Sequence, residues 1–81
     1  MDRLKGKIAI ISGGATGMGA ASARLFAVES AAVGVIDRNV DAGVALVAEL
    51  KAMGHRAHFE RADVSSKAEV EAAVAGVTAA L

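Results

Sequence analysis

The sequence of 81 residues predicts an α/β fold, in which helices cover a parallel sheet and connect its strands. Three short apolar runs alternate with three segments of helical periodicity, which gives the order βαβαβα. Strands joined by helices of this length pair in parallel through right-handed crossovers. Because the chain has no proline, low-complexity tract or internal linker, we expect one domain over residues 1–81.

The first predicted strand leads into a glycine-rich turn. Lys7–Ser12 is a β-branched run closed by glycines, which is typical of a buried strand. A helix is predicted from Gly17 to about Ser30, with Arg24 and Glu29 off its apolar stripe. That stripe consists of Met18, Ala21, Leu25 and Val28.

The second strand and helix carry clear boundary signals. Ala32–Asp37 is an apolar run, and Asn39 follows it as a predicted N-cap with Asp41 in the first helical turn. Gly54 supplies a left-handed end to this helix. The apolar stripe between these signals is Val44, Val47 and Leu50.

The third strand and helix complete the pattern. Arg56–Asp63 alternates apolar and polar residues, as expected of a strand with one solvated face. Ser66 and Glu69 have the spacing of a capping box. The helical stripe that follows is Val70, Ala73, Val74 and Val77. Moving outward from the first strand predicts the spatial order 3-2-1, with the third strand at an edge.

Composition excludes several classes of function. Nine basic and nine acidic residues cancel, so no charged surface for nucleic acid or anionic membrane is expected. The longest uncharged stretch, Ile8–Ala23, contains four glycines and is too short to span a bilayer. Cysteine is absent, which excludes disulfides and thiolate chemistry and is consistent with a cytoplasmic location.

The turn at residues 12–19 is the main candidate for binding chemistry. A diphosphate needs several N–H donors and a close approach to the backbone, and the start of a helix after glycines offers both. The spacing of Gly13, Gly17 and Gly19 matches neither G-x-G-x-x-G nor a P-loop. A glycine-rich turn of this kind also occurs for packing alone, and that alternative stays open here.

Asp37 strengthens the binding interpretation. It ends the second strand, 18 residues after Gly19. A carboxylate about 20 residues beyond the turn can accept both hydroxyls of an adenosine ribose, and it would repel a 2′-phosphate. The alternative is that Asp37 turns the chain or pairs with Arg38. Together, the turn and Asp37 favour binding of NAD, with NADP less expected.

These motifs resemble the short-chain dehydrogenase/reductase family. Gly13-x-x-x-Gly17-x-Gly19 after a short strand is similar to its glycine signature, and Leu4-x-Gly6-Lys7 is similar to its usual entry into that strand. Asp63-Val64, after the third strand, is similar to its adenine-contacting pair. The resemblance implies the N-terminal half of a Rossmann-type doubly wound sheet in an NAD(P)-dependent oxidoreductase acting on an alcohol or ketone.

The resemblance also implies a role for each matching residue. Gly13, Gly17 and Gly19 would shape the phosphate turn, and Thr16 and the Met18 backbone would contact ribose and diphosphate. Asp37 would bind the adenosine ribose. Asp63 would bind the adenine amino group, and the Val64 N–H would contact the adenine ring. Arg38 is ambiguous, since a basic residue here can hold a 2′-phosphate in NADP-preferring relatives.

The residues that perform the chemistry in this family have no counterpart here. In its Tyr-x-x-x-Lys pair the tyrosine hydroxyl exchanges a proton with the substrate oxygen and the lysine lowers the pKa of that hydroxyl, whereas this chain contains no tyrosine. We therefore expect no catalytic residue in residues 1–81, and a domain that is incomplete at its C-terminus and inactive alone. His55 and His58 are not expected to bind metal.

Three classes of function stay open at this point. The chain could be the N-terminal part of an oxidoreductase, a non-catalytic nucleotide-binding fragment, or a truncated pairing partner of a full-length relative. A complete protein is expected to form a homo-oligomer.

Overall fold

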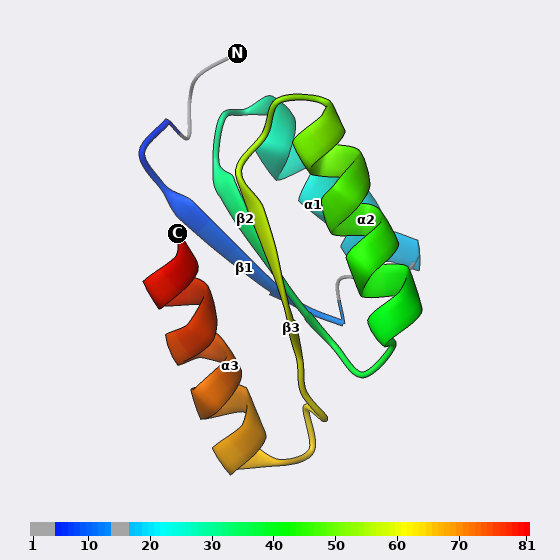
Figure 1. The fold of residues 1–81 in the computed structure, drawn as a ribbon, viewed down its shortest axis with the longest axis vertical. Helices are drawn as coiled ribbons and strands as arrows, with labels where there is room; N and C mark the ends of the chain where they lie inside the picture. The colour runs from blue at the N-terminus through cyan, green and yellow to red at the C-terminus, as the bar shows by residue number, and fades with distance from the viewer. Residues whose placement is uncertain (1–4, 14–16) are drawn as a thin grey trace.

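The computed structural model describes residues 5–13 and 17–81 and has the predicted α/β architecture (Figure 1). Three strands alternate with three helices, which confirms the order βαβαβα. The elements are β1 (Ile8–Ser12), α1 (Gly17–Val28), β2 (Ala32–Asp37), α2 (Val40–Ala52), β3 (Ala57–Arg61) and α3 (Lys67–Ala80).

The strands form a parallel sheet in the order β1-β2-β3. Ile8 of β1 lies opposite Ala32, and Val33 of β2 lies opposite Ala57 of β3. Helices α1 and α2 cover one face of the sheet, and α3 lies on the other (Figure 1). Since β2 is flanked on both sides and covered on both faces, it is almost entirely buried.

The larger hydrophobic core lies between the sheet and the α1–α2 layer. Val33 and Val35 of β2 have no exposed area there, and neither does Leu50 of α2. A bidentate ion pair from the Arg24 guanidinium to the Glu49 carboxylate, at 2.6 and 3.0 Å, links the outer surfaces of α1 and α2.

A smaller core lies between the sheet and α3. Ile36, Ala62, Ala73 and Val77 form it. Gly34 lets α3 approach β2 closely, because a Cβ at Gly34 would lie 2.3 Å from Val77 Cγ1. The absence of a side chain at this position therefore sets the distance between α3 and the central strand.

The apolar stripe predicted for α1 does not mark the side of the helix that packs on the sheet. Met18, Leu25 and Val28 are 88%, 60% and 50% exposed. The buried residues of α1 are instead Ala20, Ala23 and Ala27. Small side chains allow the helix to lie close to the sheet, while Phe26 packs partly buried against the core and Met18, Leu25 and Val28 face outward. Glu29, which the pattern placed off the stripe, is buried as well.

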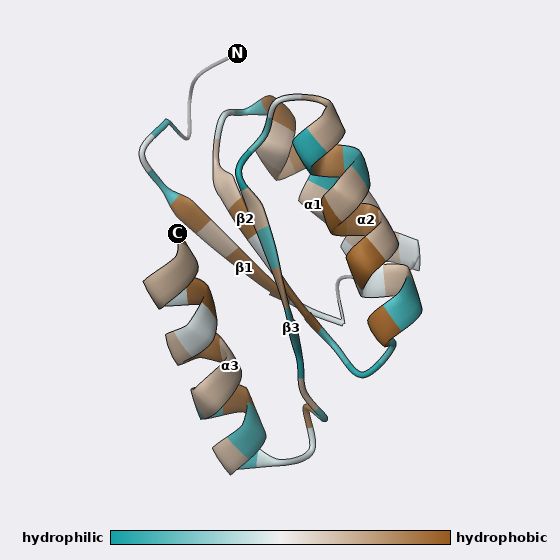
Figure 2. Ribbon diagram, in the orientation of Figure 1, coloured by the Kyte–Doolittle hydropathy of each residue, from teal (hydrophilic) through white to brown (hydrophobic). Residues whose placement is uncertain are grey.

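The helix boundaries follow the predicted cap chemistry. Asn39 Oδ1 accepts a hydrogen bond from the Ala42 N–H at 3.0 Å and so caps α2. Gly54 follows α2 with φ +90°, the left-handed conformation expected at that end. The loop from β2 to α2 is hydrophilic, whereas β1 and β2 are largely hydrophobic (Figure 2).

One face of β1 is only partly covered in the described residues. Ile8 and Ile10 are 43% and 39% exposed. Ile10 lies opposite Gly34, which meets α3, so both isoleucines belong to the α3 side of the sheet. None of the described helices is long and apolar enough to cross a membrane.

Candidate functional site

The carboxyl ends of all three strands meet at one edge of the sheet. The Gly13 N–H donates to the Ile36 carbonyl at 2.7 Å, and the Ala62 N–H donates to the Asp37 carbonyl at 3.1 Å. These bonds extend the strand pairing by one residue on each side of β2. As a result, Gly13 of the predicted phosphate turn, Asp37 and the Ala62–Asp63 segment lie side by side.

Two glycines of the turn adopt a conformation that other residues rarely take. Gly13 has φ +64° and Gly17 has φ +58°. A Cβ built on either glycine meets no atom of residues 5–13 and 17–81 within 4 Å, so this part of the chain leaves the space above both open. Because the Gly13 N–H is used by Ile36, Gly13 shapes the turn and does not supply a donor. Thr16, which was predicted to contact the ribose, lies outside the described residues.

Helix α1 begins at Gly17, within the predicted phosphate turn. The first-turn N–H groups of a helix have no partner within the helix, and the helix dipole favours an anion there. The first turn of α1 contains no acidic residue, whereas those of α2 and α3 contain Asp41 and Glu69. Gly17, Met18 and Gly19 therefore form a helix start that favours an anion from outside. The open space above the glycines also fits a ligand that must approach the backbone closely.

Asp37 ends β2 beside the turn and is partly buried. Its Oδ1 accepts a hydrogen bond from the Asn39 N–H at 2.9 Å. Asp37 therefore helps to turn the chain into α2, the structural role weighed as an alternative. This bond also fixes the carboxylate at the site edge, so the structural role is compatible with ligand binding. Arg38 is exposed beside it.

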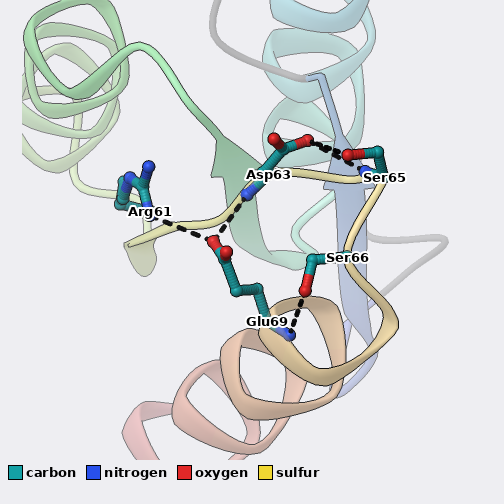
Figure 3. Close-up of polar contacts among 5 residues, drawn as sticks. All are labelled: Arg61, Asp63, Ser65, Ser66 and Glu69. Carbon is teal, nitrogen blue, oxygen red and sulfur yellow. Dashed lines mark hydrogen bonds and ion pairs between the residues drawn. The ribbon is translucent and has the colours of Figure 1, made fainter.

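Asp63 follows β3 and is held by its neighbour Ser65. Its Oδ1 accepts hydrogen bonds from the Ser65 N–H at 3.0 Å and the Ser65 hydroxyl at 2.7 Å (Figure 3). These bonds lower the pKa of the Asp63 carboxyl below its ordinary value, and the charges of Arg38 and Arg61 add to the effect. The carboxylate is thus kept ionised and can accept further hydrogen bonds. Val64 beside it is 57% exposed.

The predicted capping box at the start of α3 is only half formed. Ser66 Oγ accepts the Glu69 N–H at 3.3 Å, as expected. The Ser66 N–H, however, donates to the Asp63 carbonyl at 2.9 Å and leaves no bond for the Glu69 side chain. Glu69 Oε1 instead accepts the Asp63 N–H and the Arg61 guanidinium, each at 3.0 Å (Figure 3). These hydrogen bonds of the Glu69 side chain were not predicted from the sequence. The signal in the sequence was that the oppositely charged Arg61 and Glu69 lie on either side of Asp63.

The histidines lie elsewhere. His55 precedes β3, and His58 Nε2 lies 2.5 Å from Glu60 Oε2 on that strand. Within residues 5–13 and 17–81, no three His, Cys, Asp or Glu side chains are grouped so as to hold a metal ion. An open depression of about 360 Å³ lies at the amino end of the strands, lined by Lys7, Ala32 and Arg56 among others. It therefore lies at the opposite end of the strands from the glycine turn.

A family model described as short chain dehydrogenase matches residues 7–81. Among curated relatives, 2,5-dichloro-2,5-cyclohexadiene-1,4-diol dehydrogenase LinX of Sphingobium indicum is 44% identical over 79 residues, covering 98% of this chain and 32% of the relative. A 3-beta-hydroxysteroid dehydrogenase of Comamonas testosteroni is 43% identical over 76 residues, covering 94% of this chain and 29% of the relative. The chain thus spans about a third of the length of these relatives.

Solved structures show the same arrangement. A short chain dehydrogenase/reductase from Burkholderia phymatum in complex with NAD superimposes with a TM-score of 0.92 at 31% identity, covering 99% of this chain and 28% of that one. L-Sorbose reductase from Gluconobacter frateurii, complexed with NADPH and L-sorbose, gives a TM-score of 0.91 at 34% identity, covering 100% of this chain and 32% of that one. Both nicotinamide dinucleotides therefore occur among proteins with this fold and this level of identity.

Proposed function

Because the chain belongs to the short-chain dehydrogenase family, we propose that it is the NAD-binding N-terminal part of an oxidoreductase acting on an alcohol or ketone. One observation carries the proposal. The turn with left-handed Gly13 and Gly17 opens onto an acid-free helix start, and strand pairing places Asp37 beside it. The relatives described above are dehydrogenases or reductases, which favours an oxidoreductase over a non-catalytic fragment or a pairing partner.

The proposed binding mode distributes the dinucleotide along the carboxyl edge of the sheet. Gly13, Gly17 and Gly19 would shape the turn for the diphosphate, whose charge the start of α1 favours. The Met18 backbone would contact the ribose and diphosphate, and so would Thr16. When bound, the nicotinamide ring supplies hydride transfer. The residues of this chain would bind and orient the dinucleotide, while the Tyr that exchanges the proton and the Lys that lowers its pKa would belong to the rest of the full-length protein.

The adenosine half would lie between two carboxylates. Asp37 would accept the ribose hydroxyls, which favours NAD because the same carboxylate would repel the 2′-phosphate of NADP. Asp63 would accept the adenine amino group, with the Val64 N–H directed at the ring. The lowered pKa of Asp63 supports an acceptor that stays ionised at neutral pH.

Two further features belong to the proposal. A cytoplasmic location is proposed from the cysteine-free composition, and cell fractionation would test it. A homo-oligomer is proposed for the full-length protein from the family resemblance. A monomeric mass in light scattering would contradict that assignment.

Asp37→Asn in the full-length protein tests the cofactor assignment. Hydrogen bonds to a charged group contribute about 1.5–3 kcal/mol, so NAD affinity should fall roughly tenfold or more. The affinity for NADP should change less, because the variant also removes repulsion of the 2′-phosphate. Calorimetric titration with both dinucleotides measures this difference.

Asp41→Asn is the matched control. Asp41 carries the same charge four residues later, but it lies in the first turn of α2 and not at the end of β2. This variant should leave both affinities unchanged. An unchanged ratio of NAD to NADP affinity in Asp37→Asn would remove the assignment of Asp37.

A further inference from the structure

The segment that follows β3 holds Asp63 through its backbone as well as its side chain. Its N–H donates to Glu69 Oε1 at 3.0 Å, and its carbonyl accepts the Ser66 N–H at 2.9 Å. On the side chain, both hydrogen bonds from Ser65 go to Oδ1 (Figure 3). The position of Asp63 is therefore fixed by its neighbours, and Oδ2 is the carboxylate oxygen that these bonds leave for a ligand.

Glu69 has a second partner, the Arg61 guanidinium, whose Nη1 donates to the same Oε1 at 3.0 Å. Arg61 ends β3 two residues before Asp63 and pairs with Asp37 through the backbone register of the sheet. Its charge already helps, after the hydrogen bonds from Ser65, to lower the pKa of Asp63.

Stability alone does not explain this arrangement. The side chains of Arg61 and Glu69 are 56% and 43% exposed, and exposed ion pairs add little to the stability of a fold. The Glu69 side chain is also not needed by the N-cap residue, because the Ser66 N–H bonds to the Asp63 carbonyl. What the Glu69 carboxylate does is fix the Asp63 backbone and hold Arg61.

We propose that Glu69 is a positioning residue for the adenine half of the dinucleotide, fixing the Asp63 backbone and keeping Arg61 from pairing with the Asp63 carboxylate. This inference rests on the proposed function, since it requires Asp63 to meet the adenine amino group. Arg61 released from Glu69 would compete with adenine for Asp63 Oδ2. The nicotinamide half, bound elsewhere along the edge, would be unaffected.

The test compares Glu69→Gln, Arg61→Gln and the double variant in the full-length protein. ADP-ribose probes the adenosine half, and nicotinamide mononucleotide probes the other half. Glutamine keeps an acceptor for the Asp63 N–H but loses the charge that holds Arg61. Loss of the hydrogen bond from adenine to Asp63 in Glu69→Gln should weaken ADP-ribose binding about five- to tenfold, while the affinity for the mononucleotide should not change. The double variant should bind ADP-ribose within about twofold of the wild type.

Glu71→Gln is the matched control on the same helix. Glu71 lies 3.9 Å from Lys67 in an exposed pair away from Asp63, and its loss should not change either affinity. Wild-type affinity in Glu69→Gln, an equal loss for both ligands, or no recovery in the double variant would overturn the positioning role. If the wild-type protein itself fails to bind ADP-ribose, the proposed function fails, whatever the variants do.

Discussion

Substitution of Gly17 by alanine separates the role of the glycine turn in binding from its role in folding. Gly17 has φ +58°, and no atom of the residues that the structure describes lies within 4 Å of its Cβ position. Gly54 is a matched control, since it has φ +90° and the same empty surroundings but lies at the opposite end of α2 from the site. Gly17→Ala and Gly54→Ala therefore impose similar backbone strain at two different places.

The expected magnitudes follow from this geometry. A left-handed alanine costs roughly 1–2 kcal/mol, and the lower entropy of the unfolded chain offsets about 0.4–1 kcal/mol of it. No described atom would clash with either added methyl group, so each variant should lose about 1 kcal/mol in the free energy of unfolding. Only Gly17→Ala places a methyl group where the diphosphate would approach the backbone. Loss of one hydrogen bond to a charged group there is worth about 1.5–3 kcal/mol, or roughly ten- to a hundredfold in Kd.

Both quantities can be measured on the full-length protein. Urea denaturation gives the free energy of unfolding, and calorimetric titration with NAD gives the affinity. We expect equal destabilisation in the two variants and a loss of affinity only in Gly17→Ala. The reasoning is refuted if Gly17→Ala binds NAD as the wild type does, or if Gly54→Ala loses as much affinity.

Two further variants test the packing and the electrostatics. Gly34→Ala should lower the free energy of unfolding by about 1–3 kcal/mol in urea denaturation, because its Cβ would lie 2.3 Å from Val77 Cγ1. Adding Val77→Ala should recover part of that loss. A Gly34→Ala variant as stable as the wild type would contradict the close approach of α3. Ser65→Ala should raise the pKa of the Asp63 carboxyl part of the way toward its ordinary 3.8 in an NMR titration, because the variant removes the Ser65 hydroxyl bond and keeps the backbone N–H bond, which is the larger cause of the lowered pKa. In the wild type, the stabilising contribution of ionised Asp63 is fully present above pH 3.8 and is lost as the pH falls through the lowered pKa of Asp63. An unchanged Asp63 pKa in Ser65→Ala would refute the role of the hydroxyl bond.

Local signals in the sequence predicted the elements and most of their ends. Asn39 and Gly54 mark the two ends of α2 through their own side-chain and backbone chemistry, which depends on few neighbours. Ala32–Asp37 was predicted with the observed bounds because a buried central strand is apolar nearly throughout.

The predictions from sequence were wrong where a residue's burial or hydrogen-bond partner depends on packing between segments that are distant in the sequence. The buried face of α1 is made of alanines because the helix lies close to the sheet, and a stripe defined by larger residues such as Leu25 could not show this. The partner of the Glu69 side chain was also unpredictable. It depends on the path of the chain after β3, which lets the Asp63 carbonyl take the Ser66 N–H.

A crystal structure of the full-length protein with NAD would test the central claim most directly. The account predicts diphosphate oxygens within hydrogen-bonding distance of the N–H groups that begin α1, with the adenosine between Asp37 and Asp63. A dinucleotide bound at the amino end of the strands, or one whose diphosphate does not touch the start of α1, would contradict it.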